Sequence, residues 1–255
     1  MPFLFLALIL SSLNFSTFAA DITSARFSLE TDRYDHCVLG DCIEYGAVEA
    51  ILDDGRVLSY RLDNDSVFED IEPRLVPMGL NGRNALLVVR TYLDKGAALA
   101  ILDQRGGKLE IVAESPAIGL AHRWQNPIGV ADFDQDRKLE IATVITPHIG
   151  GTLTLYERQG NKLVKNQETF AFSNHKMGSS QLDLSEIIDW NEDGVKDIVL
   201  PDVTHHKLKV VSFSTGEGKI IDETILPLLI QGPLEAIENG VKYISSDGNE
   251  ETWQH

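Results

Sequence analysis

The sequence predicts an all-β fold, and two observations support this prediction. Short apolar runs rich in Val, Ile, Leu, Thr and Tyr recur along the chain, which is typical of pleated strands. Residues that favour turns separate these runs, as in DKG, RGGK and RQGNK. Helical periodicity is hard to find beyond the first twenty residues, so we expect strands joined by tight turns.

The expected strands follow a repeated order. Each clear unit has an apolar strand, an acidic loop, a second strand, a turn, a third strand, a glycine turn and a fourth strand. Three clear units and two weaker copies cover residues 75–115, 128–166, 184–222, 45–62 and 234–253. A four-stranded unit that repeats without helices predicts a β-propeller, because such a unit buries its faces only against its neighbours.

We expect a single β-propeller domain over residues 21–255, with about five blades and a range of about four to six. The length of this segment sets the number, since each unit takes roughly 45 to 55 residues. An antiparallel β-sandwich is the competing architecture, and the repeat argues against it.

The composition excludes two classes of protein. With 43% hydrophobic and 24% charged residues, the chain has the material for a packed core and differs from a disordered segment. The formal net charge of -17 repels phosphate backbones, so we expect no nucleic-acid partner.

The first twenty residues predict a secretory signal peptide. They contain no charged side chain, and their apolar run from Phe3 to Leu10 is too short to span a bilayer. Small residues follow, so we expect cleavage near Ala19 or Ala20 and export to the periplasm or the medium. No basic residue precedes the apolar run, which leaves a membrane tether as the alternative. We expect no transmembrane span in the mature chain.

Two cysteines, Cys37 and Cys42, lie close together in the segment HCVLGDC. In an exported protein such a pair is expected to form a disulfide across a tight turn. A zinc site built from these cysteines and His36 is the alternative.

Two acidic loops carry oxygen donors at every second position. The donors at loop positions 1, 3, 5 and 9 are Asp132, Asp134, Asp136 and Glu140 in the first loop, and Asp189, Asn191, Asp193 and Asp197 in the second. Calcium takes six to eight oxygen ligands, and we expect the backbone carbonyls of Lys138 and Val195, with water, to complete the two shells. We therefore predict two Ca²⁺ ions; solvated acidic turns without metal are the alternative.

The two loops differ from an EF-hand, because β-forming residues follow them and no glutamate stands at position 12. The first loop carries Arg137 where the second has Gly194, so we expect either a positive φ at this arginine or a changed turn. Phe133 and Trp190, at position 2, are expected to point into the core.

The segments VADFDQDRKLEIATVI and IIDWNEDGVKDIVLP resemble FG-GAP or VCBS repeats, which form the blades of integrin-α-like β-propellers in many exported bacterial proteins. The resemblance extends over roughly residues 45–222 and is sharp only in these two segments. It implies calcium at both loops, usually in a structural role, and repeats that serve in adhesion or recognition. The matching loops near Asn81 and Asp54 lack the donors, and we predict no calcium there.

Histidines suggest a further site. A pocket that combined His36, His148 and His175 would bind an anion or a transition metal at the propeller axis. The alternative reading is that turn histidines such as His148, His205 and His206 are simply exposed.

The chain contains no G-x-S-x-G, H-E-x-x-H or phosphate-cradling glycine motif. We therefore predict a non-enzymatic binding or scaffold module with a protein or glycan partner. A propeller hydrolase or lyase with a histidine-lined axial site is the alternative.

Overall fold

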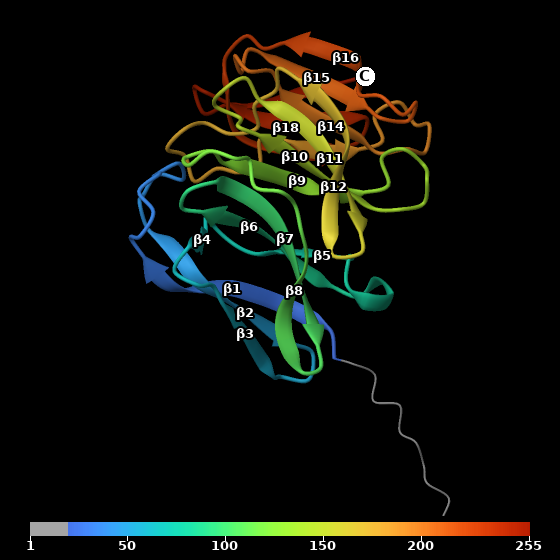
Figure 1. Ribbon diagram of the computed structural model, residues 1–255. Coiled ribbons are helices and arrows are strands. Elements are labelled where there is room, and N and C mark those ends of the chain that lie inside the picture. Colours follow the sequence, from blue (N-terminus) through green and yellow to red (C-terminus); the bar gives the residue numbers. More distant parts are fainter. Residues whose placement is uncertain (1–19) are drawn as a thin grey trace, which may run out of the picture.

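The computed structural model describes residues 20–255 (Figure 1). The predicted signal peptide, residues 1–20, lies outside the described residues except for Ala20. Residues 20–255 form nineteen strands and one short 3-10 helix, η1 (Leu80–Gly82), so the all-β prediction is confirmed. Within this range no helix combines the length and the hydropathy that crossing a bilayer requires.

The N-terminal group of strands is built around β2. Strand β2 pairs with β1 and β3 in antiparallel fashion, and it meets β4 at a single position, Tyr45 opposite Phe68. The strands of this group are β1 (Ile22–Thr31), β2 (Glu44–Leu52), β3 (Val57–Arg61) and β4 (Ser66–Phe68).

Antiparallel meanders make up the rest of the chain. In each meander, every strand pairs with the next one along the sequence. The first comprises β5 (Arg74–Val76), β6 (Ala85–Tyr92), β7 (Gly96–Arg105) and β8 (Lys108–Glu114). The second comprises β9 (Gln125–Ala131), β10 (Glu140–Ile145), β11 (Thr152–Gln159) and β12 (Lys162–Phe170). The third comprises β13 (Glu186–Ile188), β14 (Asp197–Pro201), β15 (Lys207–Ser212) and β16 (Lys219–Ile225), and the last β17 (Ile230–Ile237), β18 (Gly240–Ser245) and β19 (Glu250–Gln254).

The units are arranged in sequence order. The blue N-terminal strands lie at one end of the view and the orange and red strands at the other, with the green and yellow meanders between them (Figure 1). The first strand of each later meander packs beside that of its neighbour, since β13 lies against both β9 and β17. Only one parallel residue pair, Glu114 with Lys162, links β8 to β12 within the described chain. The result is a succession of packed β-meanders; their closure into a propeller and the number of blades stay predictions.

The hydrophobic core is divided into layers between successive units. Each of the four clusters of buried side chains combines strands from two consecutive units. Representative pairs across the four layers are Val48 and Leu102, Ile101 and Tyr156, Leu155 and Phe213, and Leu208 and Tyr243. A buried side chain of this size contributes roughly 1.5–3 kcal/mol. The layered core explains why the repeat is needed, because each sheet buries a face only against its neighbour.

Candidate cation-binding loops and a histidine-lined cleft

The two acidic loops have the same backbone path. One joins β9 to β10 and the other joins β13 to β14. At position 4 the backbone is left-handed in both loops, with φ of 62° at Gln135 and 58° at Glu192. Position 6 repeats this conformation at Arg137 (φ 68°) and Gly194 (φ 85°), so of the two outcomes expected of the arginine the structure has the positive φ and not a changed turn. A left-handed conformation costs a residue with a Cβ about 1–2 kcal/mol, whereas glycine adopts it freely.

The carboxylate at position 1 closes each loop through its backbone. The N–H of Arg137 donates to Asp132 Oδ2 at 3.0 Å, and the N–H of Gly194 donates to Asp189 Oδ2 at 3.0 Å. Each bond spans five residues and draws the loop around its own first side chain. The replacement of glycine by arginine therefore leaves this contact intact.

The carboxylate at position 9 is held in an equally regular way. The Phe133 N–H donates to Glu140 Oε2 at 2.9 Å, and the Trp190 N–H donates to Asp197 Oδ2 at 3.0 Å. Phe133 and Trp190 are buried in the core, as expected of position 2. Packing of these two aromatic rings thus fixes the backbone that holds each carboxylate.

The second oxygen of each of these carboxylates has no partner. Four buried oxygens, one from position 1 and one from position 9 of each loop, lack a hydrogen bond within the described chain: Asp132 Oδ1, Glu140 Oε1, Asp189 Oδ1 and Asp197 Oδ1. A buried acceptor without a partner costs about 1–3 kcal/mol, so a native structure rarely leaves one unexplained. The same arrangement recurs at equivalent positions of the two loops. A cation bound in each loop would give these oxygens a partner.

Burial raises the pKa of the carboxyl groups at position 9. Desolvation, together with the neighbouring carboxylates of Asp134, Asp136 and Asp132, raises the pKa of Glu140 to about 7. Desolvation likewise raises the pKa of Asp197, and Asp193 and Asp189 contribute. Burial and mutual repulsion thus disfavour the charged form of these carboxylates, and a divalent cation would offset both effects.

Position 3 and position 5 complete the first loop. Asp132, Asp134 and Asp136 each offer an oxygen, and the three atoms lie within 4.8 Å of one another. The Lys138 ammonium contacts Asp136 at 2.8 Å and Glu157 at 3.1 Å, so it competes with a cation at the rim of this loop. The donor set of carboxylate oxygens fits a hard cation such as Ca²⁺. Coordination by the Lys138 and Val195 carbonyls stays a prediction.

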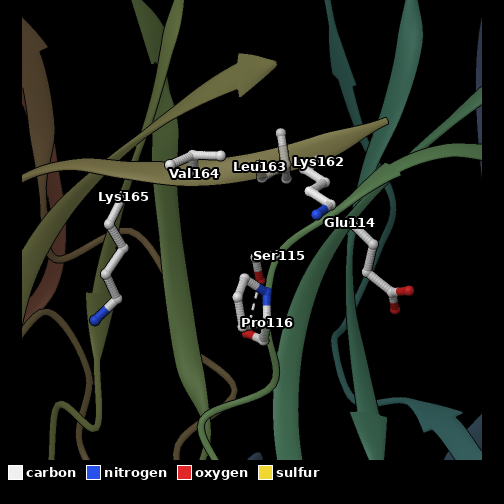
Figure 2. A pocket seen from close by; sticks show the side chains of 7 residues that line it. All are labelled: Glu114, Ser115, Pro116, Lys162, Leu163, Val164 and Lys165. Atoms are coloured by element: carbon white, nitrogen blue, oxygen red, sulfur yellow. Dashed lines mark hydrogen bonds between the residues drawn. The ribbon is translucent and has the colours of Figure 1, made fainter. Parts of the chain in front are cut away.

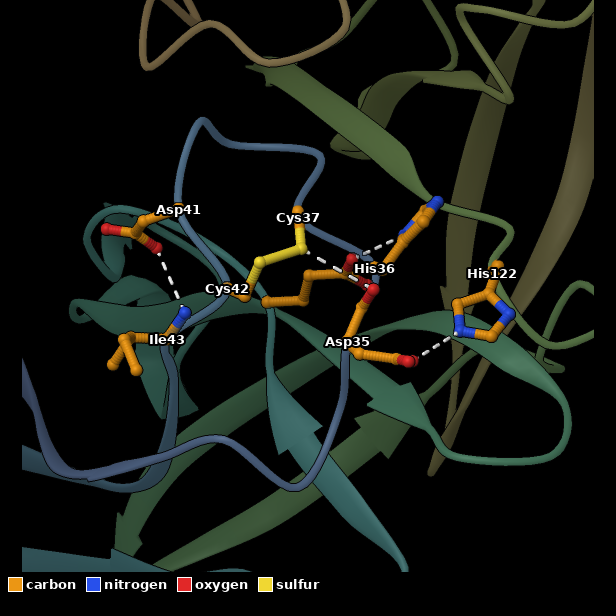
Figure 3. The surroundings of a disulfide bond; sticks show 8 residues. Asp35, His36, Cys37, Asp41, Cys42, Ile43 and His122 are labelled. Atoms are coloured by element: carbon orange, nitrogen blue, oxygen red, sulfur yellow. Dashed lines mark hydrogen bonds and ion pairs between the residues drawn. A yellow bond between two sulfur atoms is a disulfide. The ribbon is translucent and has the colours of Figure 1, made fainter.

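The predicted disulfide between Cys37 and Cys42 is present, which removes the alternative zinc site at these thiols (Figure 3). The disulfide loop precedes β2 and crosses to the segment before β13. There the Gly178 N–H donates to the carbonyl oxygen of Val38 at 2.9 Å. Gly40 has a φ of 102°, and a Cβ at this residue would come within 2.9 Å of the Gly178 oxygen. The loop is therefore tightly seated beside a group of histidines.

Three histidines from different segments line one small cleft. His36 comes from the disulfide loop, His122 from the segment before β9 and His148 from the turn between β10 and β11. The cleft has a volume of about 20 Å³, which is room for one water molecule or ion. Arg123 and Met177 also line it.

His175 lies behind His148. The Nε2 atom of His175 lies 2.7 Å from the carbonyl oxygen of Ser179 and therefore carries a proton that it donates. Its Nδ1 lies 2.8 Å from His148 Nε2 and accepts, so His148 is protonated on Nε2 and keeps a lone pair on Nδ1. Burial lowers the pKa of His148 to about 4, and the neighbouring His175 contributes. His148 is thus neutral at pH 7.

The structure brings the predicted axial histidines, His36, His148 and His175, to one region, but only the first two line the cleft. His148 and His175 form a hydrogen bond, and His36 lines the same cleft as His148. His175 lies beneath that cleft, since it is only 1% exposed. The reading of His205 as an exposed turn residue is wrong: it is buried and bonds the Ser173 hydroxyl at 2.9 Å, because the turn folds back onto the neighbouring meander.

Two acidic side chains that contact the histidines of this cleft were missed by sequence reasoning. His122 lies 3.0 Å from Asp35, and the buried Glu69 lies 2.6 Å from His36. Both contacts join residues that are far apart in the chain, and no local motif marks them. Trp124 stacks its ring against that of His148 and donates from Nε1 to the Glu69 carbonyl oxygen, which completes the wall.

A second, larger groove lies between the outer strands of two meanders (Figure 2). Strands β8 and β12 touch at one residue pair and then diverge, and the groove of about 490 Å³ opens there. Its walls are mainly apolar, and its lining residues are Glu114, Ser115, Pro116, Lys162, Leu163, Val164 and Lys165. No aromatic side chain is among them, so the groove lacks a platform for stacking a sugar ring.

No protein-family model matches the sequence. No curated protein matches it either. Among solved structures, the crystal structure of BamB from Moraxella catarrhalis is similar, with a TM-score of 0.44 and 16% sequence identity over 84% of this chain. The match covers 55% of that chain, so this protein spans about half of its length. The likeness to FG-GAP or VCBS repeats stays a prediction that rests on the two acidic loops.

Proposed function

We propose that this chain is an exported, non-enzymatic interaction module of propeller-like β-meanders, in which two calcium ions have a structural role and an outer groove binds a protein. The observation that carries the calcium part is the set of four buried carboxylate oxygens without partners, placed equivalently in two loops. Chance burial of acidic side chains would not reproduce the same hydrogen bonds at the same loop positions.

Calcium in these loops would stabilise the contacts between units. Each loop carries a buried aromatic residue at position 2, and Phe133 and Trp190 belong to two different core layers. An ion that holds the loop therefore also holds the ring that packs against the next meander. Binding to the folded state alone adds about 4 kcal/mol when the ion is present at roughly 1,000 times its dissociation constant.

Thermal unfolding with calcium and with chelator tests this role. We expect calcium to raise the Tm of the mature chain by roughly 5–15 °C, as follows from a stabilisation of a few kcal/mol in a domain of this size. Asp189→Asn and Asp197→Asn should reduce the calcium-dependent rise.

Asp54→Asn is the matched control, because Asp54 lies in an exposed turn of a unit without the donor set. Its calcium-dependent rise should equal that of the wild type. Unchanged melting of the wild type after complete calcium removal would contradict the proposed role.

The groove between β8 and β12 supports a protein partner. Strand β12 pairs with β11 on one side, whereas its other side meets β8 at one position, so backbone groups remain open to an added strand. Apolar walls and the absence of an aromatic platform favour a peptide over a glycan. The ammonium of Lys162 lies at the groove in a chain of net charge -17 and would complement an acidic residue on the partner.

A pair of matched variants tests the groove. Val164→Asp places a charge on the apolar wall, and Val57→Asp places one on an exposed valine of β3 outside the groove. A photoreactive group at Lys162 should cross-link to a protein of the cell envelope, and Val164→Asp should abolish the cross-link while Val57→Asp preserves it. Equal cross-linking in both variants, or a product that resists protease because it is a glycan, would overturn the assignment.

A further inference from the structure

We propose that the histidine-lined cleft binds a divalent transition-metal ion of the zinc type through His36, His122 and His148. This site is separate from the acidic loops, whose oxygen donors favour calcium. It also does not depend on the proposed interaction function, since none of its three histidines lines the groove between β8 and β12.

Each of the three imidazoles has one ring nitrogen engaged and the other available. His36 uses Nδ1 toward Glu69 Oε1 at 2.6 Å. His122 uses Nε2 toward Asp35 Oδ1 at 3.0 Å (Figure 3). His148 uses Nε2 toward His175. Across residues 20–255, no hydrogen bond is formed by the remaining nitrogens, which are His36 Nε2, His122 Nδ1 and His148 Nδ1.

This pattern is the one that metal-binding histidines need. A ligating imidazole usually donates its other N–H to a carboxylate or carbonyl, which fixes the tautomer and raises the basicity of the ligating nitrogen. Glu69 and Asp35 supply carboxylates for His36 and His122. For His148 the same role falls to His175, whose own tautomer is set by the Ser179 carbonyl.

The charge around the cleft favours a cation over an anion. Two acidic side chains stand behind the cleft, Glu69 at 2.6 Å from His36 and Asp35 at 3.0 Å from His122. Arg123 also lines the cleft, but its guanidinium donates to the carbonyl oxygen of His122. Neutral imidazoles ligate zinc, copper and nickel well, whereas calcium and magnesium prefer oxygen.

Binding requires a small closing movement. The ligand nitrogens of His36, His122 and His148 do not all lie within 4.8 Å of one another. Within the described chain, only Asp132, Asp134 and Asp136 form a set of three ligands that meets this distance. The rings of His36 and His122 are 5.4 Å apart, and the His122 side chain is about half exposed. For all three to share one ion, Nδ1 of this exposed ring must turn toward the other two histidines while Nε2 keeps its contact with Asp35. We therefore expect micromolar rather than nanomolar affinity.

Titration calorimetry with Zn²⁺, in the presence of millimolar calcium to fill the acidic loops, tests the proposal. The wild-type mature chain should bind one Zn²⁺ in the micromolar range. His36→Gln and His148→Gln should each weaken binding at least tenfold. Glu69→Gln, which keeps all three imidazoles, should weaken it about 10–100-fold.

His206→Gln is the matched control, because His206 lies exposed in a turn away from the cleft. Its zinc affinity should equal that of the wild type. The proposal is overturned if the wild type binds no zinc, or if the His36 and His148 variants bind as it does. Should a variant fail to fold, the histidine ring resonances of the wild type decide: zinc must shift those of His36, His122 and His148 and leave that of His206 in place.

Discussion

At the residue scale, burial of titratable groups sets much of the chemistry of this protein. Glu44 is the clearest case: it begins β2, is 2% exposed, and burial raises its pKa to about 9. The carboxylates of Glu69, Asp41 and Asp70 raise it further. The folded protein therefore keeps a proton on this side chain at neutral pH, whereas the unfolded chain releases it.

This proton has a consequence for stability. The folded-state pKa of about 9 lies above the ordinary value of 4.5, so stability is lost as the pH rises between these two values. We expect Glu44→Gln to be more stable than the wild type at pH 8 by roughly 2–4 kcal/mol, because glutamine keeps the shape and, unlike glutamate, does not ionise in the unfolded chain.

Urea unfolding at constant calcium would measure this difference at pH 8 and at pH 5. The difference between variant and wild type should nearly vanish at pH 5. A difference of the same size at both values of pH would show that Glu44 is not a buried, protonated acid.

At the element scale, the acidic loops show what sequence reasoning can and cannot reach. Their donor spacing follows from the sequence, and the sequence reduces the backbone at Arg137 to two alternatives, because both depend on neighbours within nine residues. The lack of hydrogen-bond partners at the four buried carboxylate oxygens could not be predicted. It depends on how deeply the packing of Phe133 and Trp190 buries each loop. The contact of His36 with Glu69 was also out of reach, because the two residues are 33 positions apart in the chain and no local pattern joins them.

Arg137 gives a prediction for the first loop. Arg137→Gly should raise the free energy of unfolding of the metal-free protein by about 0.5–1 kcal/mol, because glycine adopts the φ of 68° without strain. The greater conformational entropy of glycine in the unfolded chain offsets part of this stabilisation. It should also tighten calcium binding, since a positive charge leaves the loop.

Gln135→Gly separates these two effects. Gln135 has a similar φ of 62° but is neutral, so this variant should gain stability without a change in calcium affinity. Chemical unfolding and calcium titration of both variants supply the data. Equal calcium affinity in the two variants would contradict the assignment of a cation to this loop.

At the scale of the whole molecule, each repeated unit packs against the next through a layer of buried apolar side chains. The repeated order of strands in the sequence predicts the meanders, because each meander is a local pattern of strands and turns. It does not predict the contact of β8 with β12 or the seating of the disulfide loop beside Gly178, which depend on the packing of whole sheets. Those two features frame the outer groove and the histidine-lined cleft.

The central claim is that the four buried carboxylate oxygens without a hydrogen-bond partner are ligands of calcium. Anomalous scattering from crystals of the mature chain grown with calcium tests it most directly. We predict a peak in each loop, about 2.3–2.6 Å from one oxygen of the position 1 carboxylate and one of the position 9 carboxylate. Water alone in both loops at saturating calcium, with these carboxylates turned away, would contradict the account.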